Sequence, residues 1–374
     1  MTEKTKNLLN CILPGGAIFL FLLLSILLPK PEFLYSERRE PERLPELTLS
    51  SVMKDGAAYG ESFMKRFDDG YAPDNFPFRD LFRSLKGGVS TYLFRLSDKD
   101  GVYVAEGYAA EMQKQIDEAS IAHAGGKLTF IYEKYLKERG ITPYISIIPD
   151  KGYFLSAANG YPSMDYDVFI ERMLAEVDFA EYIDITPLLS ISDYYASDTH
   201  WRQERIVDVA AALCEGMGGK LEASFEENEL GADFYGVYSG RAPRKVGPER
   251  LFYLTSESLK GVRVIDHEHG GKEIGLYDLE KGAGSDAYDL FLSGELSKVN
   301  VENPNARRDR ELVVFRDSFG RSIIPLLACE YSRITVIDVR YQIPAILLSG
   351  VSFDNADVLF LYSTLVLNNS YEMK

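Results

Sequence analysis

The chain contains 374 residues, of which 46% are hydrophobic and 26% charged, so it can bury one large core or two modest ones and is not a disordered polymer. Its net charge of -16, without a long cluster of Lys and Arg, argues against a nucleic-acid partner. Three cysteines are too few for a disulfide framework. Cys214 and Cys329 either form one bridge or, in the simpler interpretation, remain buried free thiols.

The first predicted element is a membrane-spanning helix. Residues 7–29 form a run of 23 residues without a charge, which is long enough to cross the hydrocarbon core of a bilayer. Lys4 and Lys6 precede this run, and the positive-inside rule therefore places the N-terminus in the cytoplasm. A cleaved signal peptide is the alternative, but no Ala-x-Ala-like site follows the run. We therefore expect an uncleaved single-pass anchor over residues 1–30, with the rest of the chain outside the cytoplasm.

Residues 31–98 are expected to form a stalk followed by a short helical segment. Prolines and charges dominate the first part, to about residue 60, which should be extended or loosely packed. Apolar residues then recur at near-helical spacing from Phe63 to Tyr71, and a second amphipathic stretch runs to Leu96. The segment Asp74–Asp80 interrupts the pattern between these two stretches.

Residues 99–374 show the alternation of an α/β domain. After a turn at Asp100–Gly101 and a short strand, helical patterns alternate with short runs of branched apolar residues, which predicts βαβ units and a parallel sheet flanked by helices. Residues 220–310 are richer in Gly and charge and are expected to be an insertion of turns and small strands. The predicted helices cover residues 108–138, 164–179, 201–217 and 322–331, and the predicted strands cover 141–149, 182–185, 311–315, 333–339 and 357–362.

Ser318 lies where a predicted strand turns into a predicted helix. Open parallel sheets place their active sites at the carboxyl ends of strands. The hydroxyl of Ser318 is expected at such a corner, and its backbone N–H lies near the positive end of the helix dipole, where a developing oxyanion would be stabilised. The alternative is a helix N-cap, because Ser and Asp are favoured cap residues.

Asp198 and His200 are two residues apart, so on an extended backbone their side chains project from the same side. The carboxylate can then fix one imidazole nitrogen and leave the other nitrogen free to act as a base. A structural histidine held by an aspartate is the alternative, with Trp201 as part of the core. The Asp198–His200 pair indicates a catalytic site only in combination with Ser318.

Three segments carry a resemblance to a known family. They read SDTHW at residues 197–201, FRDSF at 315–319 and VIDVRY at 336–341. Together they resemble the DHHW family of bacterial membrane proteins and the related alginate O-acetyltransferase group, which has an SGNH-hydrolase-like domain. Residues 74–80 and 100–103 resemble upstream landmarks of the family, so the likeness spans most of residues 30–370. It implies an SGNH-hydrolase-like α/β fold for residues 99–374.

In that group the Asp and His precede the Ser, as they do in this chain. The resemblance implies Ser318 as nucleophile, His200 as general base and Asp198 as its orienting carboxylate. Thr199 replaces the first His of the family's name, and the Gly and Asn blocks of ordinary SGNH esterases are not assignable. Arg340 is therefore the best side-chain candidate for the oxyanion, against a strand-end salt bridge as the alternative. Tyr195 and Trp201 are weaker candidates for oxyanion or substrate contact.

The resemblance implies an extracytoplasmic O-acetyltransferase that acts on a cell-surface or exported polysaccharide through an acyl-enzyme. It also suggests a membrane-bound O-acyltransferase as the partner that supplies acetyl groups, because acetyl-CoA is cytoplasmic. An acetyl esterase with the same triad is one alternative, since water exclusion and cleft shape decide the acceptor. A non-catalytic polysaccharide-binding or assembly protein that retains the fold is another.

No cofactor is expected, because the sequence has no Walker A loop, dinucleotide glycine fingerprint or zinc ribbon. The segment Asp266–Gly270 alternates acidic residues with two histidines, a pattern that can bind a metal ion. No third cluster at ligand spacing supports it, so a solvated turn is the favoured interpretation and no metal is expected.

Overall fold

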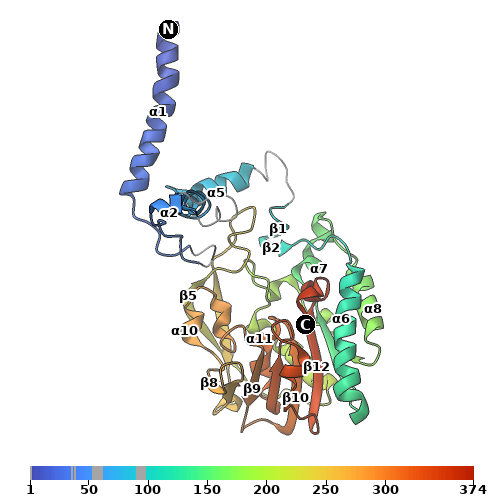
Figure 1. Ribbon diagram of the computed structural model, residues 1–374. Coiled ribbons are helices and arrows are strands. Elements are labelled where there is room, and N and C mark those ends of the chain that lie inside the picture. The colour runs from blue at the N-terminus through green and yellow to red at the C-terminus, as the bar shows by residue number, and fades with distance from the viewer. Residues whose placement is uncertain (1, 35–36, 38, 53–61, 90–97) are drawn as a thin grey trace. The chain divides into compact units, whose positions relative to one another are not determined.

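The computed structural model describes residues 2–34, 37, 39–52, 62–89 and 98–374 (Figure 1). The chain divides into two compact units, Met1–Leu96 and Ser97–Lys374. Part of the amphipathic stretch that was expected to run to Leu96 falls on residues 90–97, which lie outside the described residues.

The first unit begins with helix α1, Glu3–Leu27, whose N-terminus is capped by the Thr2 hydroxyl. In the described part of the chain, α1 is the one helix that is long and apolar enough to cross a membrane, with a mean hydropathy of 2.2 and no buried residue. The expected apolar helix is therefore present as a candidate membrane span.

The rest of the first unit consists of short helices. The expected interruption near Asp74 is present, because Phe78 adopts a left-handed backbone conformation and separates two helices. The buried Asp74 carboxylate accepts two hydrogen bonds from the Arg39 guanidinium, at 2.6 and 2.7 Å. The helices are α2 (Leu49–Val52), α3 (Phe63–Arg66), the π-helix η3 (Phe67–Tyr71), α4 (Ala72–Asp74) and α5 (Arg79–Gly88).

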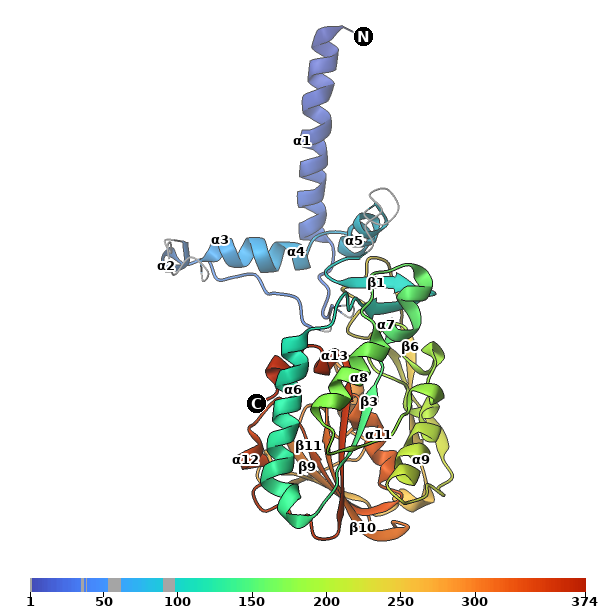
Figure 2. The ribbon, with the colours of Figure 1, turned by 90° about the vertical axis from the view of Figure 1, so that its right-hand side faces the viewer.

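The second unit, described from residue 98 onward, is built around an eight-stranded sheet in the order β4-β3-β12-β10-β11-β9-β7-β8 (Figures 1 and 2). The first five strands pair in parallel, which confirms the predicted α/β class. These strands are β3 (Tyr144–Ile148), β4 (Glu181–Tyr182), β10 (Arg308–Arg316), β11 (Tyr331–Ile337) and β12 (Ala356–Ser363).

The stretch 220–310 contains the expected turns and small strands, and three of these strands also join the central sheet. It supplies three strands that extend the sheet in antiparallel fashion, beginning with β9 beside β11. It also forms a separate antiparallel hairpin, β5 (Glu226–Phe234) with β6 (Glu249–Thr255). The three sheet strands are β7 (Arg263–Asp266), β8 (Lys272–Ile274) and β9 (Lys298–Glu302).

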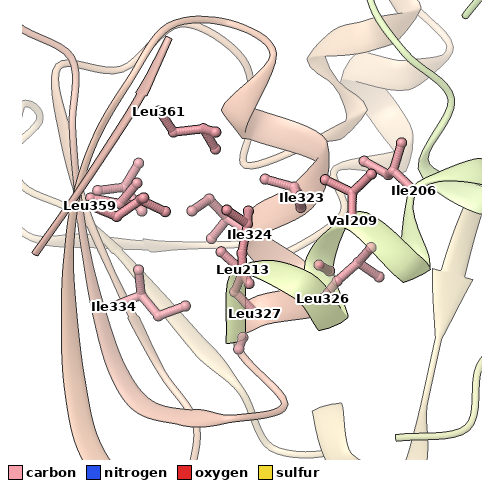
Figure 3. Packing of buried hydrophobic residues seen from close by; sticks show 14 of the residues in the cluster. Ile206, Val209, Leu213, Ile323, Ile324, Leu326, Leu327, Ile334, Leu359 and Leu361 are labelled. Atoms are coloured by element: carbon pink, nitrogen blue, oxygen red, sulfur yellow. The ribbon is translucent and has the colours of Figure 1, made fainter. Parts of the chain in front are cut away.

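Helices cover both faces of the sheet, and alternate residues of each strand serve opposite faces. Leu359 and Leu361 of β12 pack against α9 (Val207–Gly216) and α11 (Gly320–Leu327), as Figure 3 shows. Val358 and Phe360 face the opposite layer, which contains α6 (Glu118–Ile131) and α8 (Tyr166–Glu176). The central strands are therefore buried on both sides, as expected of parallel strands. Short helices complete the unit: α7 (Lys151–Leu155), α10 (Leu279–Gly282), α12 (Pro344–Leu347) and α13 (Thr364–Leu367).

The predicted helix over residues 108–138 is wrong in its first part. Residues Tyr108–Glu111 form strand β2, which pairs with β1 (Val102–Ala105) in a hairpin, and the helix begins only at Glu118. Glu106 and Gly107 both have positive φ angles, of 50° and 88°, and so form the two-residue turn that matches the twist of a hairpin. The Asp117 side chain then caps the first turn of α6.

Candidate active site

Ser318 lies in the turn between β10 and α11, at the carboxyl end of a central strand. Every residue from Leu312 to Tyr331 is buried except Ser318, so this hydroxyl is the point at which the turn reaches solvent. Gly320 makes the turn possible, because a Cβ at this position would overlap with the Arg316 side chain. The strand-to-helix corner that the sequence predicts is therefore present, and α11 begins two residues after the serine.

The Asp317 carboxylate fixes this turn. One of its oxygens accepts a hydrogen bond from the Phe319 N–H at 3.0 Å. The other accepts from the Ser363 N–H at 2.7 Å and so connects the turn to the end of β12. The carboxylate is fully buried. Its bond to the Phe319 N–H fixes the backbone that follows Ser318, and its bond to the Ser363 N–H fixes Asp317, the residue before Ser318.

His200 lies between Ser318 and Asp198. Its Nε2 atom is 2.8 Å from the Ser318 Oγ, and its Nδ1 atom is 2.6 Å from Asp198 Oδ1. Both separations are within hydrogen-bond range. The structure therefore brings together the segment that carries Asp198 and His200 and the turn that carries Ser318, which is 118 residues after His200, in the order carboxylate, imidazole, hydroxyl.

Asp198 is fully buried and nevertheless ionised. Burial raises the pKa of Asp198, but attraction to His200 and hydrogen bonds from His200 and Val237 outweigh this effect and hold the pKa below its ordinary value. The Val237 N–H donates to Oδ2 at 2.8 Å, and the His200 backbone N–H donates to Oδ1 at 3.0 Å. A permanent negative charge thus faces the Nδ1 side of the imidazole.

Aromatic rings fix the orientation of the imidazole. Tyr288 stacks on His200 with ring centres 3.9 Å apart and an angle of 6° between the planes, and Phe319 meets the imidazole at 61° and 5.0 Å. The Tyr288 hydroxyl is itself held 2.8 Å from the Ser322 Oγ. The Arg321 guanidinium lies over the Tyr288 ring, 5.2 Å from its centre. The stacking leaves the imidazole little freedom to rotate away from Ser318.

Two ionisable side chains, the buried Lys151 and the partly buried Glu249, hold the backbone that precedes Asp198, and we call them the Lys151–Glu249 clamp. The Lys151 Nζ donates to the carbonyl oxygens of Tyr195 and Ala196, at 2.9 and 3.3 Å. The Glu249 carboxylate accepts from the N–H groups of Ala196 and Ser197, at 2.8 and 2.6 Å, and from the Ser197 hydroxyl. The clamp therefore satisfies polar groups of this segment that the sheet does not reach.

Burial lowers the pKa of Lys151 to about 7, in opposition to the nearby carboxylates of Asp198, Glu249 and Asp150. The backbone at Gly236 packs tightly against the same segment, because a Cβ there would overlap with the Ser197 carbonyl and the Asp198 side chain. This close approach brings the neighbouring Val237 N–H within reach of the Asp198 carboxylate.

The other predicted site residues are enclosed by the protein. Arg340 donates from Nε and Nη2 to Asp338, at 2.9 and 2.7 Å, which is the strand-end salt bridge considered as the alternative to its oxyanion role. Trp201 is fully buried, and its Nε1 donates to the Phe319 carbonyl at 3.0 Å. Tyr195 is also fully buried, and its ring packs against Phe234. Trp201 and Tyr195 therefore support the site from behind, and their role in substrate contact stays a prediction.

One backbone group is available for an oxyanion. The Ser318 N–H has no hydrogen-bond acceptor among the residues that the structure describes, whereas the following N–H groups of Phe319 and Gly320 both donate to Asp317. It lies just before the first turn of α11, where the helix dipole favours negative charge. This N–H is a better-placed donor than the paired guanidinium of Arg340.

The Asp266–Gly270 segment forms the turn between β7 and β8, and His269 Nδ1 lies 2.7 Å from the Asp266 carboxylate. The described residues contain no group of three His, Cys, Asp or Glu side chains arranged to hold a metal ion. Cys214 and Cys329 are buried free thiols.

Sequence reasoning missed several residues that support the site. Tyr288, Val237, Gly236 and Glu249 all come from the stretch 220–310, where no periodic pattern marks them. Their roles arise from contacts between segments that are distant in the sequence. Lys151 had a weak signal, because it follows β3 and so lies at the carboxyl edge of the sheet.

No family model matches this chain, and no curated protein matches it in sequence. Solved structures match its fold. A DHHW family protein from Eubacterium siraeum aligns with a TM-score of 0.59 and 18% identity, over 73% of this chain and 93% of that chain. This chain shares the fold of that DHHW family protein. PatB1 of Bacillus cereus aligns with a TM-score of 0.58 and 16% identity, over 71% of this chain and 96% of that chain.

Replacement of Glu249 tests the clamp. In Glu249→Gln the amide cannot accept hydrogen bonds on both sides, so one of the backbone N–H groups loses its partner. We expect the free energy of unfolding to fall by about 1–3 kcal/mol, the cost of an unsatisfied buried donor. Urea unfolding in mild detergent measures the change. Glu273→Gln, at an exposed ion pair with Arg263, is the matched control and should change stability by less than about 0.5 kcal/mol. Equal effects of the two substitutions would contradict the clamp.

The pKa of Lys151 gives a prediction on pH. The folded pKa of about 7 is lower than the ordinary value of about 10.4, so between these values the unfolded chain binds more protons and the contribution of Lys151 to stability rises with pH. Lys151→Met removes this contribution. The free energy of unfolding of the variant minus that of the wild type should therefore fall as the pH rises from about 7 to about 10. Urea titrations at several pH values across this range measure the difference in free energy of unfolding. A variant of the exposed Lys245 is the control for Lys151→Met. If this difference instead rises with pH, the predicted direction of the effect of Lys151 is wrong.

Proposed function

We propose that this chain is an extracytoplasmic O-acetyltransferase that transfers acetyl groups to a cell-surface or exported polysaccharide through an acyl-enzyme on Ser318. The observation that carries the proposal is the continuous hydrogen-bonded path from Asp198 through His200 to Ser318, which ends at the one residue of its turn that solvent reaches. The sequence resemblance to the DHHW and alginate O-acetyltransferase groups supports the choice of acetyl transfer within the broader class of serine acyl transfer.

In the first half of the reaction, His200 Nε2 accepts the proton of the Ser318 hydroxyl while Oγ attacks the acetyl carbonyl carbon of the donor. The tetrahedral oxyanion is stabilised by the Ser318 N–H at the N-terminal end of α11. As the intermediate collapses, the bond to the donor's leaving oxygen or sulfur breaks. The imidazolium returns its proton to that atom, and acetyl-Ser318 remains.

In the second half, a hydroxyl of the polysaccharide gives its proton to His200 Nε2 and attacks the carbonyl carbon of acetyl-Ser318. Collapse of the second intermediate releases the acetylated sugar, and the proton returns to Oγ. Asp198 stabilises the imidazolium in both halves, because its negative charge is held permanently beside Nδ1. The stacked Tyr288 keeps the imidazole aligned between the two partners.

The proposed location follows from α1. With Lys4 and Lys6 on the cytoplasmic side, α1 anchors the chain in a bacterial membrane and residues beyond it lie outside the cytoplasm. Acetyl-CoA does not reach that side, so we propose a membrane-bound O-acyltransferase as the partner that delivers acetyl groups. The polysaccharide is the acceptor.

An acetyl esterase is the second candidate, and the partial exposure of Ser318 to solvent favours it. It would use the same first half-reaction, with water in place of the sugar hydroxyl in the second. The two activities therefore differ in the acceptor and in the exclusion of water, while the roles of Asp198, His200 and Ser318 are common to both.

A covalent probe tests the nucleophile without knowledge of the substrate. Bacillus cereus PatB1 has been solved with a sulfonyl adduct. We expect a sulfonyl fluoride to label this chain at Ser318, because Oγ attacks sulfur, fluoride leaves and His200 takes the proton. His200→Ala should slow the labelling by about 100-fold or more, and Ser318→Ala should abolish it. Peptide mass spectrometry locates the label. Labelling at another serine, or an unchanged rate in His200→Ala, would overturn the assignment of the nucleophile.

Acetyl turnover tests the function itself. The full chain in detergent should cleave a chromogenic acetyl ester, and an added oligosaccharide should become acetylated, as measured by its mass. Ser318→Ala should lower turnover by about 10³-fold or more, whereas Ser352→Ala, at an exposed serine, should leave it unchanged. Release of acetate alone, with no acetylated sugar, would favour the esterase. Equal turnover by Ser318→Ala and wild type would leave the polysaccharide-binding or assembly protein as the surviving alternative.

A further inference from the structure

Helix α5 has an apolar stripe that the described part of the chain leaves exposed. Leu81, Phe82 and Leu85 of this helix are 66%, 41% and 59% exposed, and the adjoining Phe78 and Val89 are 53% and 38% exposed. These positions are spaced by three or four residues and therefore lie along one side of the helix. We call these five residues the α5 stripe. A soluble protein rarely leaves such a continuous apolar surface open to water.

The opposite side of α5 is polar and already has partners. Arg79 and Arg83 both form ion pairs with the Glu37 carboxylate, and Arg79 is only 13% exposed. The ion pairs connect α5 to the segment that follows α1 and fix which side of the helix is turned outward. The stripe is thus the exposed side of α5, and the ion pairs with Glu37 fix the orientation of the helix about its own axis.

The stripe continues into the surface of the membrane helix. The Phe82 ring lies 5.9 Å from the ring of Phe21 in α1, and the Phe76 ring stacks on Phe21 at 5.6 Å and 14°. Phe21 precedes the last residue of α1, Leu27, by six positions. At a rise of about 1.5 Å per residue, the contact is about 9 Å inside the end of the span. Rings that contact α1 at that depth lie beside acyl chains, not beside bulk water.

We propose that α5 is an interfacial helix that inserts the α5 stripe into the outer leaflet of the membrane that α1 crosses. The occupant of the stripe is lipid, at the boundary between acyl chains and headgroups. Amphipathic helices with one apolar and one charged side bind at this depth. The proposal rests on the anchoring part of the proposed function, that α1 crosses a membrane, and not on the chemistry at Ser318.

Photolabelling in vesicles tests the proposal. The full chain is reconstituted into phosphatidylethanolamine–phosphatidylglycerol vesicles that contain a phospholipid with a photoreactive acyl chain, and labelled residues are located by mass spectrometry. We expect labels in α1 and on residues of the α5 stripe. Leu44 and Leu47, which are exposed leucines of the same unit, should carry about tenfold less label or none.

Matched variants separate insertion from general apolar contact. The double variant Leu81→Asp and Leu85→Asp should lose the label on α5 and retain it in α1. The control double variant Leu44→Asp and Leu47→Asp should keep both labels. Label in α1 without label on α5 would overturn the proposal while the anchor survives, and would point to protein that covers the stripe. Absence of label in α1 would overturn both the proposal and the membrane anchor, while leaving the acetyl-transfer chemistry to be judged by its own assays.

Discussion

The ionised carboxylate of Asp198, enclosed in the protein, is the constraint on which the candidate site depends. A buried charge is costly unless hydrogen bonds and an opposite charge surround it. Here His200 supplies the partner, and the Val237 N–H reaches the second oxygen because Gly236 lets two backbones approach closely. The Lys151–Glu249 clamp then holds the segment that carries the carboxylate. The stretch 220–310 is therefore part of the site's architecture as well as an extension of the sheet.

The parts of the fold and site that could be predicted are those with local signatures. Alternation of apolar strands and helices predicted the α/β sheet, and the corner after β10 predicted the position of Ser318. The pairing of His200 with Ser318 was implied by the family resemblance that the short motifs carry. The hairpin of β1 and β2 was predicted only in part: a short strand was expected after Asp100–Gly101, but residues 108–111, which form β2, were assigned to the helix that follows. The Tyr288 stack and the clamp have no periodic signature, since they arise only when distant segments meet.

The two units use apolar side chains in different ways. The second unit buries its large apolar residues in layers on both faces of the sheet, and those left exposed are scattered, such as Leu279 and Ile346. In the described part of the first unit, by contrast, many large apolar residues are exposed; most of them lie on α1 and along α5, and others, such as Leu44 and Leu47, lie between these helices in the sequence. Burial in the second unit stabilises a fixed geometry around Ser318. In the first unit, α1 exposes the apolar surface of a candidate membrane span.

The position of β12 has a consequence for how the molecule folds. This strand comes near the end of the chain and yet lies in the middle of the sheet, between β3 and β10, and the Ser363 N–H at its end completes the bonding of Asp317. During synthesis, the edges of β3 and β10 that pair with β12 remain unpaired until β12 has been made. Such long-range parallel pairing is slow, and open edges invite aggregation. The turn that carries Ser318 thus acquires its contact with Ser363 only after β12, the last of the eight sheet strands in the sequence, has been made.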